Sequence, residues 1–506
     1  MVLQQTGRRS LFSLVLIVMA VFISTARAFI LPRASRNVVH TAMSSPSSLR
    51  IRSVMMSSVA EQGSEQTKEV DILTAELKSD FLKTMRDRGF FHQCTDLEGL
   101  DKKMSEEGPV KAYLGFDATA DSLHVGSLLQ ILILRNLQRA GHKPIVLVGG
   151  GTTKVGDPSG KDEARKLLTE ADIQRNIDGI SGVFRKFLAF GDGPTDALLV
   201  NNDEWLSELN YLQFLRDYGP HFTINRMLNF ESVRLRLERE QPLSFLEFNY
   251  MILQGYDFLE LSRRYDVALQ LGGSDQWGNI INGIDLARKL DQKQVFGLTA
   301  PLITTSDGKK MGKSAAGAVW LNADKLPAYD YWQFWRNTAD EDVVRFMKLF
   351  TELPLEQIEG YAALTGAAIN DAKVVLADEA TRMLHGEACL GPIKEAAAAL
   401  FAGGGGQGGG GGGAADSGAL PTVALAPGEL GEEGGTGGVP AVDLYLKLGF
   451  AKSKAEARRL IKGGGARLND VKIEDENYVV GAGDFTDGRL KLSSGKKKHG
   501  IVELQQ

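Results

Sequence analysis

A tract of glycine divides this chain and limits what can fold on either side of it. Ten of the eleven residues from Gly403 to Gly413 are glycine, and only Gln407 interrupts them. A glycine-rich segment behaves as a flexible coil and supplies no side chains from which a core could form. Sequence containing Gly and Pro continues to about residue 440, so we expect 403–440 to be a linker. The 506 residues should therefore fold as a large body before the tract and a small module after it.

Charge is spread unevenly along the chain. Residues 1–60 hold seven arginines and no acid, and residues 441–506 hold 13 lysines and arginines against nine acids. Since the formal net charge of the whole chain is −5, residues 61–440 carry the balance of −16. This asymmetry makes the basic module, rather than the acidic body, the candidate partner of a polyanion. The two cysteines, Cys94 and Cys389, are too few for a disulfide framework or a cysteine-rich zinc site.

The first 60 residues have the composition of targeting sequence. Arg8 and Arg9 precede an apolar run from Leu11 to Ile23, and Ala26-Arg27-Ala28 supplies the small residues of a cleavage site. Residues 29–60 then carry arginines and serines without any acid, as transit peptides do.

We interpret 1–64 as a disordered signal plus transit peptide, similar to the two-part address of proteins that enter plastids bounded by extra membranes. Import into such a plastid is our first interpretation, and delivery to the mitochondrion is the second. The apolar run is shorter than the about 20 residues that span a bilayer. A retained anchor helix is the alternative; we expect no stable membrane association of the mature form, which should begin near residues 59–70.

Between about residues 65 and 400, short apolar runs alternate with helical patterns. The strand candidates are 110–116, 144–148, 197–200, 267–271 and 301–304. The stretch 126–140 is apolar on most sides, which predicts a buried helix. Alternation of this kind favours a mostly parallel α/β sheet with helices on both faces. From about Asp324 to Leu400 the strand pattern disappears, so a helical subdomain should follow the sheet.

Two polar segments follow predicted strands, where parallel sheets bind ligands. The first runs from Gly115 to Ser127 and leads into the buried helix, whose free amides and positive dipole end suit a phosphate. His124 adds a donor there, although a histidine before a helix is more often a cap. The second is Lys309-Lys310-Met311-Gly312-Lys313-Ser314, whose clustered lysines suit a polyphosphate, although such a segment taken alone is more often a solvated basic turn.

In this order and about 185 residues apart, the two segments resemble the "HIGH" and "KMSKS" motifs of the class I aminoacyl-tRNA synthetases. Three further blocks resemble those of the bacterial-type tyrosyl-tRNA synthetases: Gly156-Asp157-Pro158-Ser159-Gly160, Tyr250-Met251-Ile252-Leu253-Gln254-Gly255-Tyr256-Asp257 and Gly272-Gly273-Ser274-Asp275-Gln276-Trp277-Gly278-Asn279. The resemblance as a whole runs from about residue 75 to the C-terminus. The glycine tract is the clear interruption.

The resemblance implies an α/β fold: a Rossmann-like parallel sheet in a catalytic domain over 65–323, an α-helical subdomain over 324–402 that contacts tRNA, and a small α+β S4-type RNA-binding module over 441–506. It implies a tyrosine–tRNA ligase of organellar translation that works as a homodimer. L-tyrosine, ATP and tRNA(Tyr) would be its partners. Magnesium would accompany ATP, and no dedicated protein metal site is expected.

The resemblance also assigns site residues. Tyr113 and Asp257 would hold the phenol hydroxyl of tyrosine, so that a substrate without it leaves two buried polar groups unpaired. The remaining tyrosine contacts would be Asp157, Asn201, Tyr250, Gln254 and Gln276. The residues acting on the reacting phosphates would be His124, Lys310, Lys313 and Ser314. The ATP pocket would be formed by Gly115, Asp117, His124, Gly126, Ser127, Gly273, Asp275 and Lys313.

Three positions depart from the family pattern. Ser127 stands where the second histidine of "HIGH" is usual, and it can donate a hydrogen bond but never carries a positive charge. Ala118 replaces a usual proline, and Gly312 replaces the first serine of "KMSKS". We expect activity to survive, since the helix amides and the lysines remain.

The C-terminal module resembles an S4 domain at 451–461, 465–469 and 495–499. Clustered lysines and arginines suit contacts with phosphates, although a solvated basic helix is the alternative. The candidate RNA-binding residues are Lys452, Lys454, Arg458, Arg459, Lys462, Arg467, Lys496, Lys497 and Lys498.

Two rival functions share much of this pattern. A tryptophan synthetase has the same fold and both ATP motifs, but an indole offers no hydroxyl to Tyr113 and Asp257. An RNA-binding scaffold that lost catalysis is the other rival, and Ser127 is the one feature that favours it.

Overall fold

A computed structural model of the chain describes residues 72–159, 168–308, 311–314, 317–402, 420–426, 430, 438–486, 488–495 and 498–505. The interpretations placed on residues 1–64, on most of 403–440, and on Lys310, Lys496 and Lys497 fall outside these residues, as do the side chains of Lys313 and Ser314.

A six-stranded sheet in the order β1-β6-β5-β2-β3-β4 organises the body. Five strands are parallel: β2 (Lys111–Asp117), β3 (Lys143–Gly149), β4 (Leu198–Asn201), β5 (Leu269–Gly273) and β6 (Phe296–Ala300). The edge strand β1 (Gln93–Cys94) is antiparallel to β6, and the sequence pattern did not predict it. The chain builds outward from β2 to β4 and then returns to β5 on the other side of β2. Strand order therefore reverses between β2 and β5, which makes their carboxyl ends the expected ligand site.

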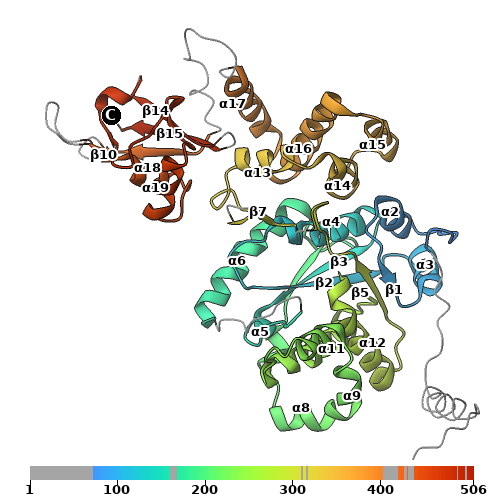
Figure 1. Ribbon diagram of the computed structural model, residues 1–506. Helices are drawn as coiled ribbons and strands as arrows, with labels where there is room; N and C mark the ends of the chain where they lie inside the picture. The colour runs from blue at the N-terminus through green and yellow to red at the C-terminus, as the bar shows by residue number, and fades with distance from the viewer. Residues whose placement is uncertain are drawn as a thin grey trace, which may run out of the picture. The chain divides into compact units, whose positions relative to one another are not determined.

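Helices cover both faces of the sheet, as Figure 1 shows. The odd-numbered side chains of β2 and β3, such as Tyr113 and Ile145, pack with α11 (Phe245–Tyr265) and α12 (Trp277–Asp291). Even-numbered ones, such as Leu114 and Val146, share a core with α4 (Val125–Arg139) and α6 (Glu170–Phe187). The alternation follows from the period of two along a strand. The predicted helix 126–140 is confirmed.

Four of the five predicted strands are confirmed within two residues at either end, and one is wrong. We expected a strand at 301–304, but these residues come directly after the strand, since β6 lies at Phe296–Ala300. Pro301 has no backbone N–H and cannot take part in the ladder of a central strand, so the chain leaves the sheet there. All five residues of β6 are buried, because helices cover both sides of it.

Short helices lie in the connections that follow β3 and β4. They are α5 (Gly150–Thr153), α7 (Asp203–Leu206), α8 (Tyr211–Asp217), α9 (Ile224–Met227) and α10 (Glu231–Glu238). A buried ion pair joins α10 to α11, where Arg236 lies 2.7 Å from Glu247. Glu247 also closes a capping box with Ser244 at the start of α11.

The predicted helical subdomain is present. It contains α13 (Ala328–Arg336), α14 (Val343–Phe350), α15 (Leu355–Ala362), α16 (Ile369–His385) and α17 (Leu390–Ala402). Trp335, Phe346 and Phe350 belong to the same continuous core as α4, so this subdomain packs on the catalytic domain through apolar side chains.

The C-terminal module has its own core, and the expected linker contributes to it. Its main sheet has the order β12-β11-β14-β15-β9, and β9 (Thr422–Leu425) pairs in parallel with β15 (Lys498–Leu504). We expected 403–440 to contribute to no core, but Leu425 is fully buried. The β-branched and apolar residues of β9 are obscured by the average composition of the glycine-rich segment around them.

The other elements of the module pack on this sheet. The strands are β11 (Ala466–Leu468), β12 (Val471–Lys472) and β14 (Arg489–Ser494), and a separate pair is formed by β10 (Val439–Pro440) and β13 (Val479–Val480). The helices are α18 (Ala441–Lys447) and α19 (Lys454–Lys462).

Candidate active site

The candidate tyrosine residues meet at the carboxyl ends of β2 and β5. Tyr113 comes from β2, and α11 crosses beside it with Tyr250, Gln254 and Asp257. Spacings of four and three residues place these last three on one face of the helix. All but Gln254 are less than a tenth exposed. The fold therefore assembles from distant segments the residues that the sequence blocks singled out.

Tyr113 and Asp257 form a buried polar pair. Each is 1% exposed, and the Tyr113 hydroxyl has no hydrogen-bond partner among the described residues. Burial raises the pKa of Tyr113 well above its usual range, and the nearby charge of Asp257 raises it further. The Tyr113 ring packs edge to face on Phe258, the neighbour of Asp257, with 5.3 Å between ring centroids. An unpaired buried hydroxyl costs free energy, so this end of the pocket is built for a polar ligand group.

Two residues that the sequence analysis missed hold the Asp257 carboxylate. Asn202 Nδ2 donates to Oδ2 at 2.9 Å, and the Trp205 indole Nε1 donates to Oδ1 at 2.8 Å. Burial nevertheless raises the pKa of Asp257 to about 8, because desolvation outweighs these two hydrogen bonds. Donors on both oxygens fix the orientation of the carboxylate before any ligand arrives.

Asn201, which the resemblance placed in the tyrosine pocket, has a different environment. Its Oδ1 accepts from the backbone N–H of Gly150 at 3.1 Å and of Asp203 at 3.0 Å. Asn202, one residue later, is the amide that reaches Asp257. The sequence could have distinguished Asn202 from Asn201 by its spacing from Trp205, since residues three apart share one face of a helical turn and can reach the same carboxylate.

The opposite end of the pocket is lined by carboxylate and amide groups. Gln276 Nε2 donates to Asp157 Oδ2 at 3.0 Å. Asn279, which the sequence analysis did not select, donates to Gln254 Oε1 at 2.8 Å and to Gln276 Oε1 at 3.0 Å. Asp157 Oδ1 also accepts from the Ser159 backbone N–H at 2.8 Å. Asp157, Gln254 and Gln276 therefore lie together, and their oxygens suit an ammonium group.

A chain of hydrogen bonds runs from Asp257 to the end of β2. Asn202 Nδ2 also donates to Thr152 Oγ1 at 3.0 Å, and Thr152 Oγ1 donates to Asp117 Oδ1 at 2.9 Å. The Tyr250 hydroxyl donates to Asp117 Oδ2 at 3.3 Å. Polar contacts thus run from Asp257 to Asp117, which ends β2 on the side predicted to bind ATP.

His124 is the N-cap residue of α4. Its Nδ1 accepts from the Gly126 backbone N–H at 3.0 Å. That contact requires Nδ1 to be unprotonated, so a neutral ring carries its proton on Nε2. The capping role weighed from the sequence is present, and the N–H donor of the ring is then Nε2. Ser127 lies in the first turn of α4, and its backbone N–H donates to the His124 carbonyl at 2.8 Å.

The second motif lies directly against the first. The Val319 N–H donates to the Gly312 carbonyl at 3.1 Å, and the Val125 N–H donates to the Val319 carbonyl at 2.9 Å. A Cβ added to Gly312 would lie 2.9 Å from the Gly126 nitrogen and 3.0 Å from His124 Nδ1, and Gly312 has a φ of +100°. Glycine is therefore needed at 312 for this close approach. Lys313 and Ser314 form β7, which pairs with β8 (Gly317–Ala318).

The other predicted ATP residues lie on the same side of the sheet. Gly115 is within β2, Gly273 ends β5, and Asp275 lies in the short turn Ser274–Gln276 that follows. Among the described residues, no group of three His, Cys, Asp or Glu side chains could hold a metal ion.

The basic residues of the C-terminal module lie mainly on α19. Ala457 and Ile461 face its core, and Lys452, Lys454, Arg458, Arg459, Lys462 and Arg467 are exposed. Two of them have acidic partners, since Lys454 lies 2.7 Å from Asp443 and Lys462 lies 3.1 Å from Glu476. Lys498 is partly buried at the start of β15.

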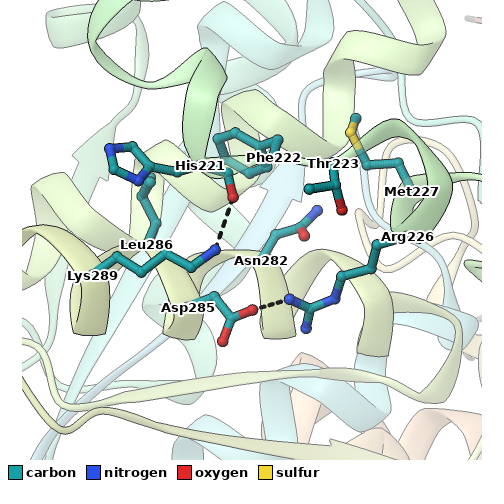
Figure 2. A pocket seen from close by; sticks show the side chains of 9 residues that line it. All are labelled: His221, Phe222, Thr223, Arg226, Met227, Asn282, Asp285, Leu286 and Lys289. Carbon is teal, nitrogen blue, oxygen red and sulfur yellow. Dashed lines mark hydrogen bonds and ion pairs between the residues drawn. The ribbon is translucent and has the colours of Figure 1, made fainter. Parts of the chain in front are cut away.

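Two surface hollows lie away from the tyrosine pocket. Figure 2 shows the smaller, of about 20 Å³, between the segment around α9 and helix α12; Lys289 donates there to the His221 carbonyl at 2.9 Å, and Arg226 pairs with Asp285. The larger, of about 290 Å³, lies at the amino ends of β2 and β5. Neither is at the carboxyl ends of the strands, so the hydrogen bonds rather than cavity size identify the site.

None of the described helices is both long enough and apolar enough to cross a membrane.

Comparison with known proteins supports the same reading as this geometry. Residues 104–402 match the family model of class I tRNA synthetases (W and Y), and residues 442–485 match the S4 domain. A tyrosine–tRNA ligase of Caulobacter vibrioides is 58% identical over 426 residues, which covers 84% of this chain and 98% of that protein. The tyrosine–tRNA ligase of Rhodospirillum rubrum is 57% identical over 428 residues, with 84% and 98% covered.

Solved structures agree. A C-terminally truncated mitochondrial tyrosyl-tRNA synthetase of Aspergillus nidulans matches with a TM-score of 0.57 and 27% identity, covering 64% of this chain and 95% of that one. The corresponding truncated enzyme of Coccidioides posadasii matches with a TM-score of 0.53 and 30% identity, covering 62% and 90%. This chain therefore belongs to the class I aminoacyl-tRNA synthetases and, within them, to the bacterial-type tyrosyl-tRNA synthetases.

Proposed function

We propose that this enzyme activates L-tyrosine with ATP and transfers the tyrosyl group to tRNA(Tyr) for translation inside an organelle. The observation that carries the choice of amino acid is the buried pair of Tyr113 and Asp257, which offers an unpaired hydroxyl and an oriented carboxylate to a phenol. Phenylalanine would leave the Tyr113 hydroxyl unpaired and would bring no phenolic donor to Asp257, and an indole would carry no hydroxyl to either group.

In the first step, a carboxylate oxygen of tyrosine attacks the α-phosphorus of ATP, and the bond to pyrophosphate breaks. The chain supplies no nucleophile, so its residues position the reactants and stabilise the charge that develops on the phosphates. Asp157, Tyr250 and Gln254 hold the substrate ammonium. Magnesium arrives with ATP and shares the charge of its phosphates.

His124, Lys310, Lys313 and Ser314 act on the phosphates. His124 donates from Nε2, and the lysines lie on a loop that closes over ATP. Gly115, Asp117, Gly126, Ser127, Gly273 and Asp275 line the nucleotide pocket. In the second step, a hydroxyl of the terminal ribose of tRNA attacks the acyl carbon and AMP leaves. No covalent intermediate with the enzyme forms.

Charging of tRNA by purified protein from residue 65 onward tests this proposal. We expect radioactive tyrosine to become bound to tRNA(Tyr) when ATP and Mg²⁺ are present, and AMP to form in equal amount. Charging with tryptophan instead would support the first rival. Binding of RNA without any charging would support a scaffold that lost catalysis, the reading that Ser127 favours.

Exposed apolar side chains of the catalytic domain favour a homodimer. Six exposed apolar side chains lie on α8 to α11, at exposures between 45% and 75%: Tyr211, Leu212, Ile224, Leu237, Phe245 and Leu246. Exposed apolar surface on this scale commonly marks an interface. Sedimentation equilibrium should give twice the monomer mass, and Phe245→Asp with Leu212→Asp should give the monomer. A wild-type monomer at micromolar concentration would contradict the proposal.

The module at 441–506, together with the helical subdomain, would bind tRNA. Its basic residues Lys452, Lys454, Arg458, Arg459, Lys462, Arg467, Lys496, Lys497 and Lys498 would contact phosphates, and the glycine tract would tether it.

The N-terminal segment would direct the protein to a plastid, with the mitochondrion as the second candidate. A fusion of residues 1–70 to a fluorescent protein tests this, because a plastid signal supports the first address and a mitochondrial signal the second. A fusion that stays in the cytosol would contradict both.

A further inference from the structure

The loop that carries the second motif is held at its root by the helical subdomain. The loop leaves the sheet after β6, and the Met311 N–H donates to the Ile303 carbonyl at 3.0 Å, which closes the two arms on each other. At this root, the Ser306 backbone N–H is bonded to Asp342, the residue before α14, and the Thr304 carbonyl is bonded to Arg345 of α14.

Asp342, the residue before α14, makes the first of these contacts. It is 3% exposed, and its Oδ2 accepts from the Ser306 backbone N–H at 2.8 Å. Its Oδ1 accepts from Arg345 Nη2 at 2.7 Å, and the same Arg345 nitrogen donates to the Thr304 carbonyl. One ion pair at the start of α14 therefore bonds both the N–H of Ser306 and the C=O of Thr304. Hydrogen bonds to charged groups are shorter and stronger than neutral ones.

The other end of α14 is fixed to the catalytic domain. Arg88 of α2 (Asp80–Arg88) donates to the carbonyls of Lys348 at 3.0 Å, Thr351 at 2.8 Å and Leu353 at 2.6 Å. Carbonyls at a helix C-terminus lack partners within the helix, so the guanidinium satisfies groups that would otherwise stay unpaired. Arg135 and Arg139 of α4 also pair with Glu352, each at 2.5 Å.

These contacts make α14 a bridge between the two ATP motifs. Its C-terminal end is bonded to α4, the helix that begins at His124, and its N-terminal end is bonded to the loop that leads to Lys310 and Lys313. Figure 1 shows α14 beside α4 and α2. The side chains of Phe346, Met347 and Phe350 on α14 are buried in the core shared with α4. A shift of α14 would therefore disrupt the packing of that core.

We propose that Asp342 is a positioning residue for tyrosine activation, and that through Ser306 it fixes the segment 303–308, which leads into the second motif, relative to His124. The inference rests on the proposed function, because Lys310 and Lys313 act on the triphosphate there. Gly312 of the second motif lies against Gly126 and His124, so an anchored segment 303–308 holds the motif in a fixed position relative to His124. Loss of the Asp342 contact should spread the positions of the motif relative to His124, which lowers the fraction of productive complexes.

Three variants of the full-length mature enzyme test this. Asp342→Ala removes the acceptor of the Ser306 N–H. Asp342→Asn keeps one acceptor oxygen for that N–H. Asp340→Ala is the matched control, because Asp340 lies in the same turn, is exposed, and pairs with Lys373 rather than with the loop.

We expect Asp342→Ala to lower kcat/KM for ATP in tyrosine-dependent pyrophosphate exchange by about tenfold or more. The Kd for tyrosine, measured by equilibrium dialysis without ATP, should stay within about twofold of wild type, because no residue of the tyrosine pocket moves. Asp342→Asn should recover most of the loss, and Asp340→Ala should match wild type. Equal loss in ATP and tyrosine parameters, or equal effects of the two alanine variants, would overturn the proposal.

Hydrogen–deuterium exchange gives a readout that needs no activity. Amides in a peptide covering 303–308 should exchange faster in Asp342→Ala, while peptides from α11 should be unchanged. If the unmodified enzyme failed to exchange pyrophosphate, the proposed function would fall, but faster exchange at 303–308 would still support the contact. If the unmodified enzyme is active and 303–308 is unaffected by Asp342→Ala, the positioning role alone is wrong.

Discussion

At the scale of single residues, the burial of Asp257 favours recognition of a phenol but disfavours the charged form of the carboxylate. Recognition of a phenol needs a dry carboxylate, but burial disfavours its charge and raises its pKa to about 8. The nearby acids Asp117 and Glu260 raise that pKa further, and the hydrogen bonds from Asn202 and Trp205 lower it. The protein therefore gives up stability to keep a polar group where tyrosine binds, as functional sites commonly do.

This conflict predicts how stability depends on pH. The folded protein without ligand holds a proton on Asp257 up to about pH 8, whereas the unfolded chain releases it above about pH 4. Between these values the folded state binds more protons, so the free energy of unfolding should fall as pH rises. Asp257→Asn cannot titrate, and it should remove this component of the slope. Urea unfolding of both proteins from pH 5 to pH 8 measures the difference, and parallel pH profiles would show that Asp257 is not protonated in the folded state.

At the scale of elements, the sequence predicted four of the strands, the helix after β2 and the helical subdomain, but it did not predict the short connecting elements. Strands β2 to β5 are marked by short apolar runs, because both faces of the sheet are covered. The prediction placed strand β6 too late, at 301–304, because the apolar pattern continues past the proline at which the strand ends. The edge strand β1 has two residues, too few to give a pattern.

The same limit applies to the candidate site. Tyr113, Asp157, Tyr250, Gln254, Asp257 and Gln276 could be selected from the resemblance. The structure places Tyr113 near Asp257, and it links Asp157, Gln254 and Gln276 through hydrogen bonds. Asn202, Trp205 and Asn279 could not be selected, because their role depends on which neighbour each side chain reaches after folding. Asp342 illustrates this most clearly, since it contacts a loop 36 residues earlier in the sequence.

The close contact of the two motifs predicts a specific effect of Gly312→Ala. A Cβ at this position would meet Gly126 and His124, and the φ of +100° is strained for alanine. We expect kcat for pyrophosphate exchange to fall by about tenfold or more, with the Kd for tyrosine unchanged.

Gly308→Ala is the control. Gly308 lies in the same loop with a φ of +78°, but an added Cβ there would meet nothing within 4 Å. It should impose backbone strain without a clash and cost less activity. If both variants lose the same activity, strain in the loop rather than contact between the motifs explains the loss.

At the scale of the whole molecule, activation and tRNA binding should separate. The pocket residues all lie in the catalytic domain, and the basic α19 belongs to a module with its own core. Because β9 pairs with β15, a deletion should begin no later than Leu420 so that β9 is not left without its partner.

Removal of 420–506 should therefore leave tyrosine-dependent pyrophosphate exchange within about twofold of wild type, and should raise the KM for tRNA in charging by about tenfold or more. Parallel exchange and charging assays on one preparation measure both effects. A truncated enzyme that charges tRNA normally would show that the module does not contribute to tRNA binding.

The central claim is that Tyr113 and Asp257 select a para-hydroxylated ring, and pyrophosphate exchange tests it most directly. Purified enzyme should exchange pyrophosphate with tyrosine but not with phenylalanine or tryptophan, and Asp257→Ala should lose the activity with tyrosine. Comparable exchange with phenylalanine, or full activity of Asp257→Ala, would contradict the assignment of this pocket.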